Sequence, residues 1–417
     1  MNQPVVIDTK TATPAAAPVA AVAPQKTPAG VLSRCHNIAD LREASRRRLP
    51  KGVFEFFDRG SEDEIALRGN REAFHNVKMR NKVLVDVSNR STAATILGKP
   101  ATMPLAIAPT GVAGVCWFEG ELALARAAAK FGVPFTLATP SLSTIESVAE
   151  AGQGARQWFQ LYMWRERDLS HALVKRAQDA GFETLILTVD TAVPPVREYN
   201  RRNGFSMPFT MNPKALLDMS LHPGWLLNTM APHYFKYGMP RLANFPKDGA
   251  SGVASNKPGR IVNQRGDNLT WDDVKRLREM WKGPMMIKGV HLAEDAARAV
   301  TEGLDGLVIS NHGGRNLATA VASLDVLPDI KAEVGDKLKV IVDSGIRRGS
   351  DIVKALALGA DFVLSGRPTL YGASVAGEEG AFHALQILRD EMDSTMGFIG
   401  CNSVGEIGPK AVWVPKA

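Results

Sequence analysis

A histidine and an arginine stand three residues apart on a glycine-rich segment in the last third of the chain. The segment Gly306 to Arg315 opens with a short apolar run and then presents His312 and Arg315 on either side of Gly313 and Gly314. Such a turn places a titratable base and a fixed cation at one point, and the glycines let the backbone approach a ligand closely. These residue types suit proton transfer beside a bound anion. A surface loop whose histidine and arginine are merely solvated would show the same pattern.

Other polar side chains follow short apolar runs in the same manner. If those runs are parallel strands of one barrel, their carboxyl ends share a single mouth, and the polar residues there belong together. Core packing does not explain polar groups that recur at the same end of successive strands. The residues concerned are Pro109, Thr110, Gly111, Gln160, Tyr162, Thr188, Asp190, Arg197, Lys288 and Ser310. Of these, Lys288 is expected to end its strand.

Two turns rich in glycine and arginine come later. The first, 343–349, contains Asp343, Gly345 and Arg347, and the second is Gly366-Arg367. The loops after the last two strands of a barrel often bind phosphate through backbone N–H groups and a guanidinium. Two routine turns with solvated arginines are the alternative. The sequence has no GxGxxG after a strand, no P-loop and no HExxH, which disfavours Rossmann, P-loop and zincin chemistry.

Eight short apolar runs supply the elements that position these residues. Continuous Val, Ile and Leu, rather than alternation, indicate strands buried on both faces. Helical segments lie behind the runs, so the sequence predicts an α/β fold, a (β/α)8 TIM barrel. The predicted strands are 105–108, 133–137, 158–162, 184–189, 285–287, 306–309, 340–342 and 362–364. The predicted helices are 121–131, one opened by a capping box at 143–146, 169–180, 270–281, 293–302 and 350–358.

The remaining segments define the domain organisation. We expect a disordered Ala- and Pro-rich tail at 1–32, an N-terminal helical cap at 33–100, the barrel at 101–392 with an insertion at 195–267, and a C-terminal segment at 393–417. In the cap, a helix over 38–48 leads to a break at 49–52 and an aromatic segment at 53–57. A capping box from Ser61 to Glu64 is expected to start the next helix.

Composition and charge exclude several classes. The chain of 417 residues, 45% of them hydrophobic, is long enough for one barrel with appendages. The net charge of +7 is spread out, without a basic stripe interleaved with aromatics, so we expect no nucleic-acid binding. Cys35, Cys116 and Cys401 lie far apart, which fits a reducing compartment and argues against structural zinc. We therefore expect no metal.

The location of the protein follows from the same features. No apolar run approaches the roughly 18 residues that a membrane span needs, so we expect a cytoplasmic protein. The long insertion mixes Met, Trp, Pro and Gly irregularly, and such a loop is usually a lid or an interaction segment. Its apolar and basic content leaves open a peripheral contact with the inner membrane through 200–262.

Several longer motifs carry a family resemblance. They are Leu-Pro-Lys-Gly-Val-Phe-Glu-Phe-Phe (49–57), Trp-Phe-Gln-Leu-Tyr (158–162), Leu-Thr-Val-Asp-Thr (187–191), Ile-Lys-Gly-Val (287–290), Ser-Asn-His-Gly-Gly-Arg (310–315) and Asp-Ser-Gly-Ile-Arg-Arg-Gly (343–349). From about residue 36 to 405 the chain resembles the FMN-dependent α-hydroxy-acid oxidising family, which includes glycolate oxidase, L-lactate dehydrogenases and (S)-mandelate dehydrogenase. The motifs Leu-His-Pro-Gly-Trp (221–225) and Gly-Met-Pro-Arg-Leu-Ala-Asn-Phe (238–245) are most similar to the mandelate dehydrogenase branch.

The resemblance implies that FMN lies across the barrel mouth. Lys288 would stabilise the negative charge that the reduced flavin acquires, although a buried lysine can also be part of a structural ion pair. The phosphate would be bound by Gly345, Arg347, Gly366 and Arg367. The ring would be contacted by Pro109, Thr110, Gly111, Gln160, Thr188, Lys288 and Ser310, with Asp343 towards the ribityl chain.

The resemblance also implies roles towards a small 2-hydroxy-acid substrate. His312 would be the base, taking a proton either from the hydroxyl, with hydride transfer, or from the α-carbon, through a carbanion. Asp190 would accept the other imidazole N–H and stabilise the imidazolium. Arg197 and Arg315 would bind the substrate carboxylate, and Tyr162 would form a hydrogen bond with a substrate oxygen.

Three positions bear on the substrate and the electron acceptor. Phe56 stands where most members have a tyrosine that contacts the carboxylate, a loss of roughly 0.5 to 1.5 kcal/mol for a neutral hydrogen bond. We therefore expect a bulkier or aromatic substrate. Ala138 replaces a common serine near the flavin. Gly111 stands where oxidases often carry alanine, which favours a dehydrogenase that passes electrons to a quinone or an electron carrier.

Other functions stay open on the sequence alone. The first alternative is a 2-hydroxy-acid oxidase that uses O2 and makes H2O2. An FMN-barrel isomerase shares the phosphate site but has no need of His312, Arg197 and Arg315 together. An inactive binding barrel is a further alternative, which Phe56 favours slightly. The resemblance implies a homo-oligomer, namely a homotetramer.

Overall fold

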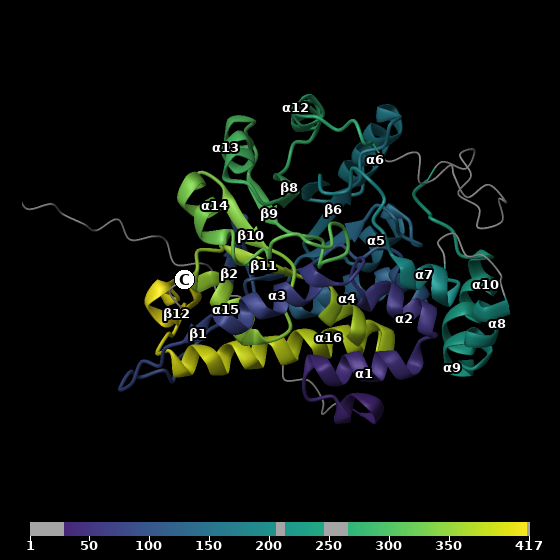
Figure 1. Cartoon of the computed structure of the whole chain (residues 1–417), viewed down its shortest axis with the longest axis horizontal. Coiled ribbons are helices and arrows are strands. Elements are labelled where there is room, and N and C mark those ends of the chain that lie inside the picture. The colour runs from purple at the N-terminus through teal and green to yellow at the C-terminus, as the bar shows by residue number, and fades with distance from the viewer. Residues whose placement is uncertain (1–28, 206–212, 246–265, 415–417) are drawn as a thin grey trace, which may run out of the picture.

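The computed structural model describes residues 29–205, 213–245 and 266–414. Eight parallel strands close into a barrel in which each strand pairs with the next and β11 pairs with β4 (Figure 1). The strands are β4 (Leu105–Ile107), β5 (Phe135–Ala138), β6 (Gln157–Leu161), β7 (Thr184–Thr188), β8 (Met285–Val290), β9 (Gly306–Ile309), β10 (Lys339–Val342) and β11 (Phe362–Ser365). The predicted TIM barrel is confirmed.

Side chains fill the interior of the barrel. The inward-facing residues include Trp158 and Phe362, whose ring centroids lie 5.8 Å apart in an edge-on arrangement. The hairpin of β2 (Ala94–Ile96) and β3 (Lys99–Ala101) adds Ile96 to this inner cluster. Lys99 of the hairpin pairs with Glu183 at 2.6 Å, just before β7 begins, so the hairpin covers the amino-terminal end of the barrel. The hairpin therefore closes this end of the barrel.

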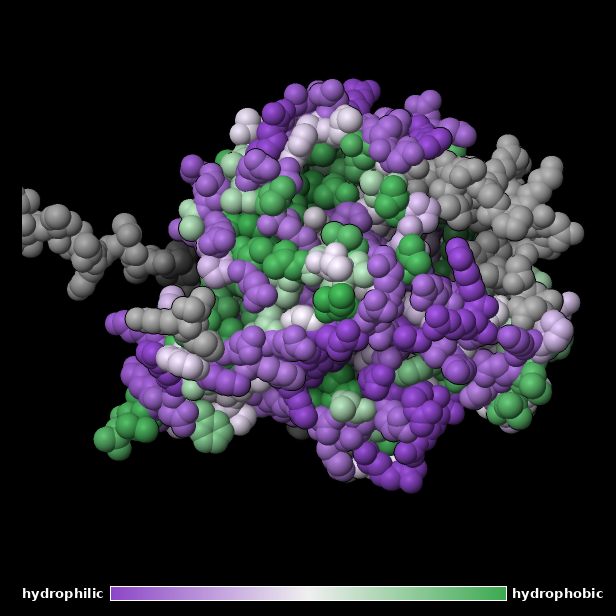
Figure 2. Space-filling view, viewed as in Figure 1, coloured by the Kyte–Doolittle hydropathy of each residue, from purple (hydrophilic) through white to green (hydrophobic). Residues whose placement is uncertain are grey.

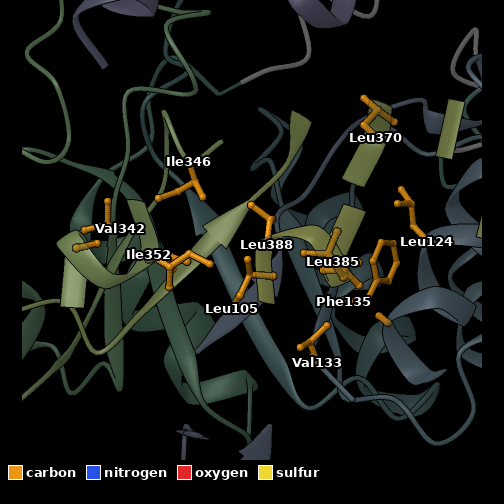
Figure 3. Packing of buried hydrophobic residues seen from close by; sticks show 14 of the residues in the cluster. Leu105, Leu124, Val133, Phe135, Val342, Ile346, Ile352, Leu370, Leu385 and Leu388 are labelled. Atoms are coloured by element: carbon orange, nitrogen blue, oxygen red, sulfur yellow. The ribbon is translucent and has the colours of Figure 1, made fainter. Parts of the chain in front are cut away.

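A second and larger hydrophobic cluster joins the outer faces of the strands to the surrounding helices. Figure 3 shows Leu385 and Leu388 of the long helix α16 in this cluster, together with Leu105 of β4 and Phe135 of β5. The helices that follow the strands are α4 (Gly120–Phe131), α5 (Ile145–Ala151), α6 (Arg167–Asp179), α12 (Trp271–Met280), α13 (Ala293–Thr301), α14 (Leu327–Val334), α15 (Gly349–Ala357) and α16 (Arg367–Phe398). The expected cap of α5 was placed one residue early, because Thr144 rather than Ser143 accepts the hydrogen bond from the N–H of Ser147.

The N-terminal segment is helical and packs on the barrel. It contains a 3-10 helix η1 (Gly30–Arg34), α1 (Ile38–Arg48), α2 (Lys51–Asp58) and α3 (Ile65–Asn76), and β1 (Lys78–Met79) pairs with β12 (Val412–Trp413) near the C-terminus. Short 3-10 helices η4 (Val404–Glu406) and η5 (Pro409–Ala411) precede β12. Residues 1–28 of the expected tail lie outside the described residues.

Two local predictions in this segment are wrong. The break expected at 49–52 is shorter, since Lys51 and Gly52 already belong to α2 and their N–H groups both donate to the Asp218 carboxylate at 3.0 Å. The capping box expected at Ser61 does not form. Instead α3 begins after Glu64, which adopts a left-handed conformation with φ of 62°, and the buried Ser61 hydroxyl makes no hydrogen bond within the described residues.

Most of the described part of the insertion is helical, and residues 238–245 are irregular. The helices are α7 (Glu198–Asn203), α8 (Pro213–Ser220), α9 (Pro223–Trp225), the π-helix η3 (Leu226–Met230) and α10 (Ala231–Tyr237). Trp225 is buried, and its indole N–H donates to the Val115 carbonyl at 2.8 Å, in the 3-10 turn η2 (Ala113–Val115) after β4. Within the described ranges, no helix has the length and hydrophobicity to cross a membrane.

Candidate active site

A cavity of about 840 Å³ opens at the carboxyl-terminal end of the strands. Asp190 and Ser310 are not on its wall; they contact His312 and Lys288, respectively, from behind. The expected contact of Ser310 with the flavin stays a prediction. The other predicted site residues all line the cavity: Phe56, Pro109, Thr110, Gly111, Gln160, Tyr162, Thr188, Arg197, Lys288, His312, Arg315, Asp343, Gly345, Arg347, Gly366 and Arg367.

His312 is held on both sides of its ring. Its Nδ1 atom lies 3.2 Å from Oδ1 of Asp190, and its Nε2 atom lies 3.2 Å from the hydroxyl of Tyr162. The residue adopts a left-handed backbone conformation with φ of 58°, which is uncommon outside glycine. Its backbone N–H donates to the Ser310 hydroxyl at 3.0 Å, which fixes the turn. The ring is therefore oriented before any substrate arrives.

The electrostatic surroundings keep His312 neutral and Asp190 charged. Burial lowers the pKa of His312 by more than the nearby Asp190 carboxylate raises it, so the pKa lies below its ordinary value. Burial raises the pKa of Asp190, but His312 and Lys288 together more than offset this, and that pKa is also lowered. A neutral imidazole beside a carboxylate is a base whose protonated form is stabilised by its neighbour.

Lys288 forms the centre of a second buried group. Its Nζ donates to the Ser310 hydroxyl at 2.8 Å and pairs with Asp343 at 2.9 Å, and Ser310 in turn donates to Asp343 at 2.7 Å. Burial lowers the pKa of Lys288, but Asp343 and Asp190 more than offset it, so the net shift is upward and the lysine is a fixed cation. Lys288 was expected to end its strand. Instead β8 continues to Val290, and its pairing with β9 is irregular between Lys288 and Val290.

The substrate end of the cavity carries two guanidiniums and an aromatic ring. Arg197 donates from Nε and Nη2 to the Arg315 carbonyl, at 3.2 and 2.9 Å. Burial and the neighbouring Arg197 lower the pKa of Arg315 to about 10. The Arg315 guanidinium lies 5.3 Å from the centroid of the Phe56 ring. The Arg197 and Arg315 guanidiniums therefore both line this end of the cavity, which suits a carboxylate ligand.

At the other end, two buried arginines lie beside the turns after β10 and β11. Arg367 donates to the carbonyls of Phe57 and Gly313, each at 2.9 Å, and Arg347 donates to the Ile346 carbonyl at 2.8 Å. Neither forms an ion pair with any residue in the described part of the chain. Burial lowers the pKa of Arg347 to about 10. Buried cations that meet only carbonyls favour binding of an anion such as phosphate.

Polar groups between these two ends remain available to a ligand. The buried Thr110 hydroxyl has no hydrogen-bond partner among the described residues, although it lies on the cavity wall. Gln160 donates to the Thr188 hydroxyl at 2.8 Å, and both line the same wall. At Gly111, an added Cβ would lie 2.9 Å from the Pro140 ring, so the backbone passes close to the next loop there. An orphaned buried hydroxyl is rare in a folded protein and calls for a bound partner.

Comparisons with known proteins agree with this geometry. Residues 45–414 match the family model described as FMN-dependent dehydrogenase. The chain belongs to this family. It is 42% identical over 373 residues to the (S)-mandelate dehydrogenase of Pseudomonas putida, covering 89% of this chain and 92% of that protein. It is 40% identical over 374 residues to the L-lactate oxidase of Nostoc sp., covering 89% of this chain and 96% of that protein.

A solved structure extends the match to three dimensions. The crystal structure described as the monotopic membrane protein (S)-mandelate dehydrogenase superposes with a TM-score of 0.84 at 40% sequence identity, covering 91% of this chain and 100% of that chain. This FMN-dependent dehydrogenase therefore oxidises 2-hydroxy acids with FMN as its cofactor. The predicted family, activity class and cofactor are confirmed. The cavity fits FMN, because it offers paired arginines without acidic partners, an unpartnered Thr110 hydroxyl and a buried Lys288 cation.

Sequence reasoning missed most of the apolar wall of the cavity. The wall includes Trp164, Phe205, Leu242 and Phe245 in addition to Phe56. Phe205 and Phe56 have ring centroids 5.1 Å apart, and those of Trp164 and Phe245 are 4.5 Å apart. The segment 238–245 was noticed only as a family motif. The two apolar residues Leu242 and Phe245 within this motif were the available signal.

Proposed function

We propose that the protein oxidises an (S)-2-hydroxy acid with a bulky aromatic side chain to the 2-oxo acid, with His312 as the base. One observation carries the proposal. The buried, neutral imidazole of His312 faces the cavity between Asp190 and Tyr162, with Arg315 on the same wall. This arrangement offers proton removal and carboxylate binding at one point.

Each of these residues has a separate role in the proposed reaction. Arg315 and Arg197 bind and orient the substrate carboxylate, which places the hydroxyl and the α-carbon near Nε2 of His312. His312 accepts the proton at Nε2, and Asp190 stabilises the resulting imidazolium through Nδ1. Tyr162, already 3.2 Å from that nitrogen, forms a hydrogen bond with the substrate oxygen. When bound, FMN accepts the two electrons that leave the α-carbon.

Further proposed roles concern the cofactor. Arg347 and Arg367, with the turns at Gly345 and Gly366, bind the phosphate. Thr110, Gln160 and Thr188 form hydrogen bonds with the ring, and Pro109 and Gly111 pass close to it. Lys288 stays protonated, as its raised pKa supports, and neutralises negative charge on the ring, while Asp343 orients Lys288.

The shape of the cavity supports an aromatic substrate. Phe56 has no hydroxyl to offer the carboxylate, so a small acid such as lactate loses one contact. A larger side chain gains contact with Trp164, Phe205, Leu242 and Phe245. Burial of a phenyl group against such a wall contributes on the order of 2 kcal/mol. The relatives include an (S)-mandelate dehydrogenase, whose named substrate has a phenyl group.

The proposal is tested by anaerobic mixing of the purified, FMN-loaded protein with a panel of 2-hydroxy acids. We expect (S)-mandelate to bleach the flavin absorbance at about 450 nm faster than lactate or glycolate, and the (R)-enantiomer to leave it unchanged. Preference for lactate would overturn the assignment of an aromatic substrate. If no acid bleaches the flavin, the protein is an inactive binding barrel.

We also propose peripheral contact of the insertion with a membrane. Figure 2 shows hydrophobic atoms over α8 and α9 at the edge of the molecule. Leu221, Leu227 and Phe235 are 69%, 66% and 86% exposed. The exposed Lys214 of α8 suits anionic lipids, whereas Lys236 of α10 already pairs with Glu119 at 2.7 Å. A quinone, which is lipid-soluble, is then the proposed electron acceptor.

Vesicle co-sedimentation tests this contact. The protein should sediment with vesicles of phosphatidylglycerol and phosphatidylcholine, and a Leu227→Asp, Phe235→Asp variant should not. The control is Leu84→Asp, which changes a leucine outside the insertion that is more exposed than Leu227 and should leave sedimentation unchanged. Equal sedimentation of all three proteins would contradict the contact.

We also propose that the protein is a homotetramer, as the family resemblance implies. Gel filtration with light scattering tests this state.

The second candidate is an oxidase that uses O2, since an L-lactate oxidase is among the relatives. In air-saturated buffer an oxidase forms one hydrogen peroxide for each 2-oxo acid. A dehydrogenase turns over only after addition of a soluble quinone or dye. We expect the second outcome, and rapid stoichiometric peroxide would favour the oxidase.

A further inference from the structure

The segment Leu242 to Phe245, where the insertion returns to the barrel, forms part of the cavity wall. Leu242 and Phe245 both line the cavity, and the Phe245 ring lies 4.5 Å from that of Trp164. Trp164 follows Tyr162 by two residues, so this wall begins next to the hydroxyl that contacts His312. The side chain of a substrate held at His312 therefore has this segment within its surroundings.

The middle of the segment is fastened to the loop before α5. Asn244 is only 3% exposed. Its Oδ1 accepts a hydrogen bond from the N–H of Ile145 at 3.0 Å, and its Nδ2 donates to the Ser143 carbonyl at 3.2 Å. The N–H of Ala243 donates to the Ser141 carbonyl at 2.9 Å. Three hydrogen bonds thus fix Ala243 and Asn244. Leu242 and Phe245, on either side of this pair, line the cavity.

The loop beneath the segment forms hydrogen bonds with other parts of the chain. The N–H of Ile145 belongs to the first residue of α5, where no helical carbonyl is available to it, so Asn244 supplies its partner. The buried Glu121 carboxylate accepts from the N–H of Leu142 at 3.2 Å and from the Ser143 hydroxyl at 3.3 Å. The Asn244 amide therefore joins the segment to a loop that hydrogen bonds tie to the barrel, and it supplies two of the three hydrogen bonds that hold Leu242 and Phe245 in place.

We propose that Asn244 is a positioning residue that selects the substrate side chain, because it holds Leu242 and Phe245 against Trp164 as one face of an aryl-binding subsite. The inference rests on the proposed function. Asn244 hydrogen-bonds to the loop before α5 and not to His312 or Arg315, so the proton transfer itself does not depend on it. An acid with a phenyl group needs the wall, and an acid with a methyl group does not reach it.

The test compares (S)-mandelate with (S)-lactate in the Asn244→Ala variant of the full-length, FMN-loaded protein. Loss of two hydrogen bonds with buried partners should lower kcat/KM for mandelate by about tenfold or more, mainly through KM, because the wall binds substrate and transition state alike. The value for lactate should stay within about twofold. An equal fall for both acids, or an unchanged ratio between them, would overturn the proposal.

A binding measurement separates this inference from the proposed function. By calorimetry, the Kd of phenylacetate, which cannot be oxidised at a hydroxyl, should rise in the variant by the same factor as KM for mandelate, while the Kd of acetate should not change. If the unmodified protein reduces its flavin with neither acid, the proposed function fails, yet the phenylacetate comparison still decides the role of Asn244. A Kd of phenylacetate that is the same in both proteins rejects that role.

Two further variants guard against loss of folding. Phe245→Ala leaves the Asn244 hydrogen bonds in place and should also lower the mandelate-to-lactate ratio. Asn244→Asp retains an oxygen for the Ile145 N–H but cannot donate to Ser143, and its ratio should lie between those of the unmodified protein and Asn244→Ala. The matched control is Asn228→Ala, whose side chain donates to the Gly224 carbonyl at 2.9 Å in the same insertion. It should change neither acid's kinetics, and a shifted ratio there would contradict the assignment to Asn244.

Discussion

His312 and Asp190 meet across a strand that lies between them. Asp190 follows β7 and His312 follows β9, while β8 pairs with both strands. The Nδ1 and Oδ1 atoms are nevertheless only 3.2 Å apart. Gly289 of β8 leaves the necessary room, since an added Cβ there would lie 2.5 Å from the Cβ of Asp190. The pair therefore depends on a glycine in the intervening strand.

Gly289→Ala should separate the pair. The added methyl group displaces Asp190, and the backbone at Gly289, with φ of 113°, does not suit an L side chain. We expect substrate-dependent flavin reduction to slow by about 10²-fold or more. Flavin content, read from the absorbance spectrum, should be retained in part. Full-speed reduction would show that the pair tolerates displacement.

His312→Ala should abolish reduction by any 2-hydroxy acid while FMN stays bound, because the ring contributes the base and not a phosphate contact. General base catalysis of this kind contributes about 10²–10⁴-fold. Stopped-flow absorbance under anaerobic conditions gives the rate, and the spectrum of the protein after gel filtration gives the bound flavin. Rapid reduction by the variant would remove His312 from the role of base.

The pH dependence of the reaction reports the His312 pKa. The imidazole has to be neutral to accept a proton, and its pKa lies below the ordinary value of about 6.5, so kcat/KM should stay level as pH falls to that value and decline only below it. The Asp190 carboxylate raises this pKa, so in Asp190→Asn the decline should move to lower pH and the plateau should drop by about 10²–10⁴-fold. A decline that moves to higher pH would contradict the arrangement.

Arg347→Ala should weaken FMN binding by about 10- to 100-fold, as expected for loss of one charge-assisted hydrogen bond. The FMN-free protein should not lose stability in parallel, because the buried Arg347 and Arg367 repel each other without an anion. Fluorescence titration gives the Kd of FMN, and thermal melting of the FMN-free protein gives the stability. Arg348→Ala is the control, since Arg348 pairs with Glu391 at 2.5 Å and lies off the cavity wall. Equal effects of both variants on the Kd would argue against the phosphate site.

Phe56→Tyr should improve the binding of small acids. The new hydroxyl can reach a carboxylate held by Arg315, whose guanidinium lies 5.3 Å from the ring centroid. A gain of roughly 0.5 to 1.5 kcal/mol corresponds to a KM for lactate lowered by about 2- to 12-fold. Steady-state kinetics with lactate and mandelate measure it. A KM for lactate that stays the same would mean that the carboxylate lies out of reach of this position.

Much of the fold was predictable because the strands are short, apolar and buried on both faces. Leu307 to Ile309 could only be a barrel strand or a buried helix, and its repetition at seven other places decided the matter. Local capping was less predictable. Ser61 and Ser143 both fit a capping pattern, but left-handed Glu64 and neighbouring Thr144 begin the two helices instead. The residue at which a helix begins depends on tertiary contacts that a short stretch of sequence does not contain.

Some residues of the candidate site could likewise be predicted from the sequence, and others could not. Residues near the carboxyl ends of strands, such as Lys288 and His312, were found because the barrel brings these ends together. The contacts of the Ser310 hydroxyl with Lys288 and Asp343 were not predictable, because sequence does not reveal which side of a turn a hydroxyl faces. Phe245 and Asn244 lie far along an irregular insertion, and only the folded chain shows that they return to the cavity.

The packed interior of the barrel has a consequence for how ligands enter the cavity. Trp158 and Phe362 fill the axis, and Ile96 of the hairpin closes the amino-terminal end, so these residues leave no passage through the barrel to the cavity. Both the acid and the electron acceptor therefore reach the cavity from the carboxyl-terminal side of the barrel, and none of these inner residues lies on their route.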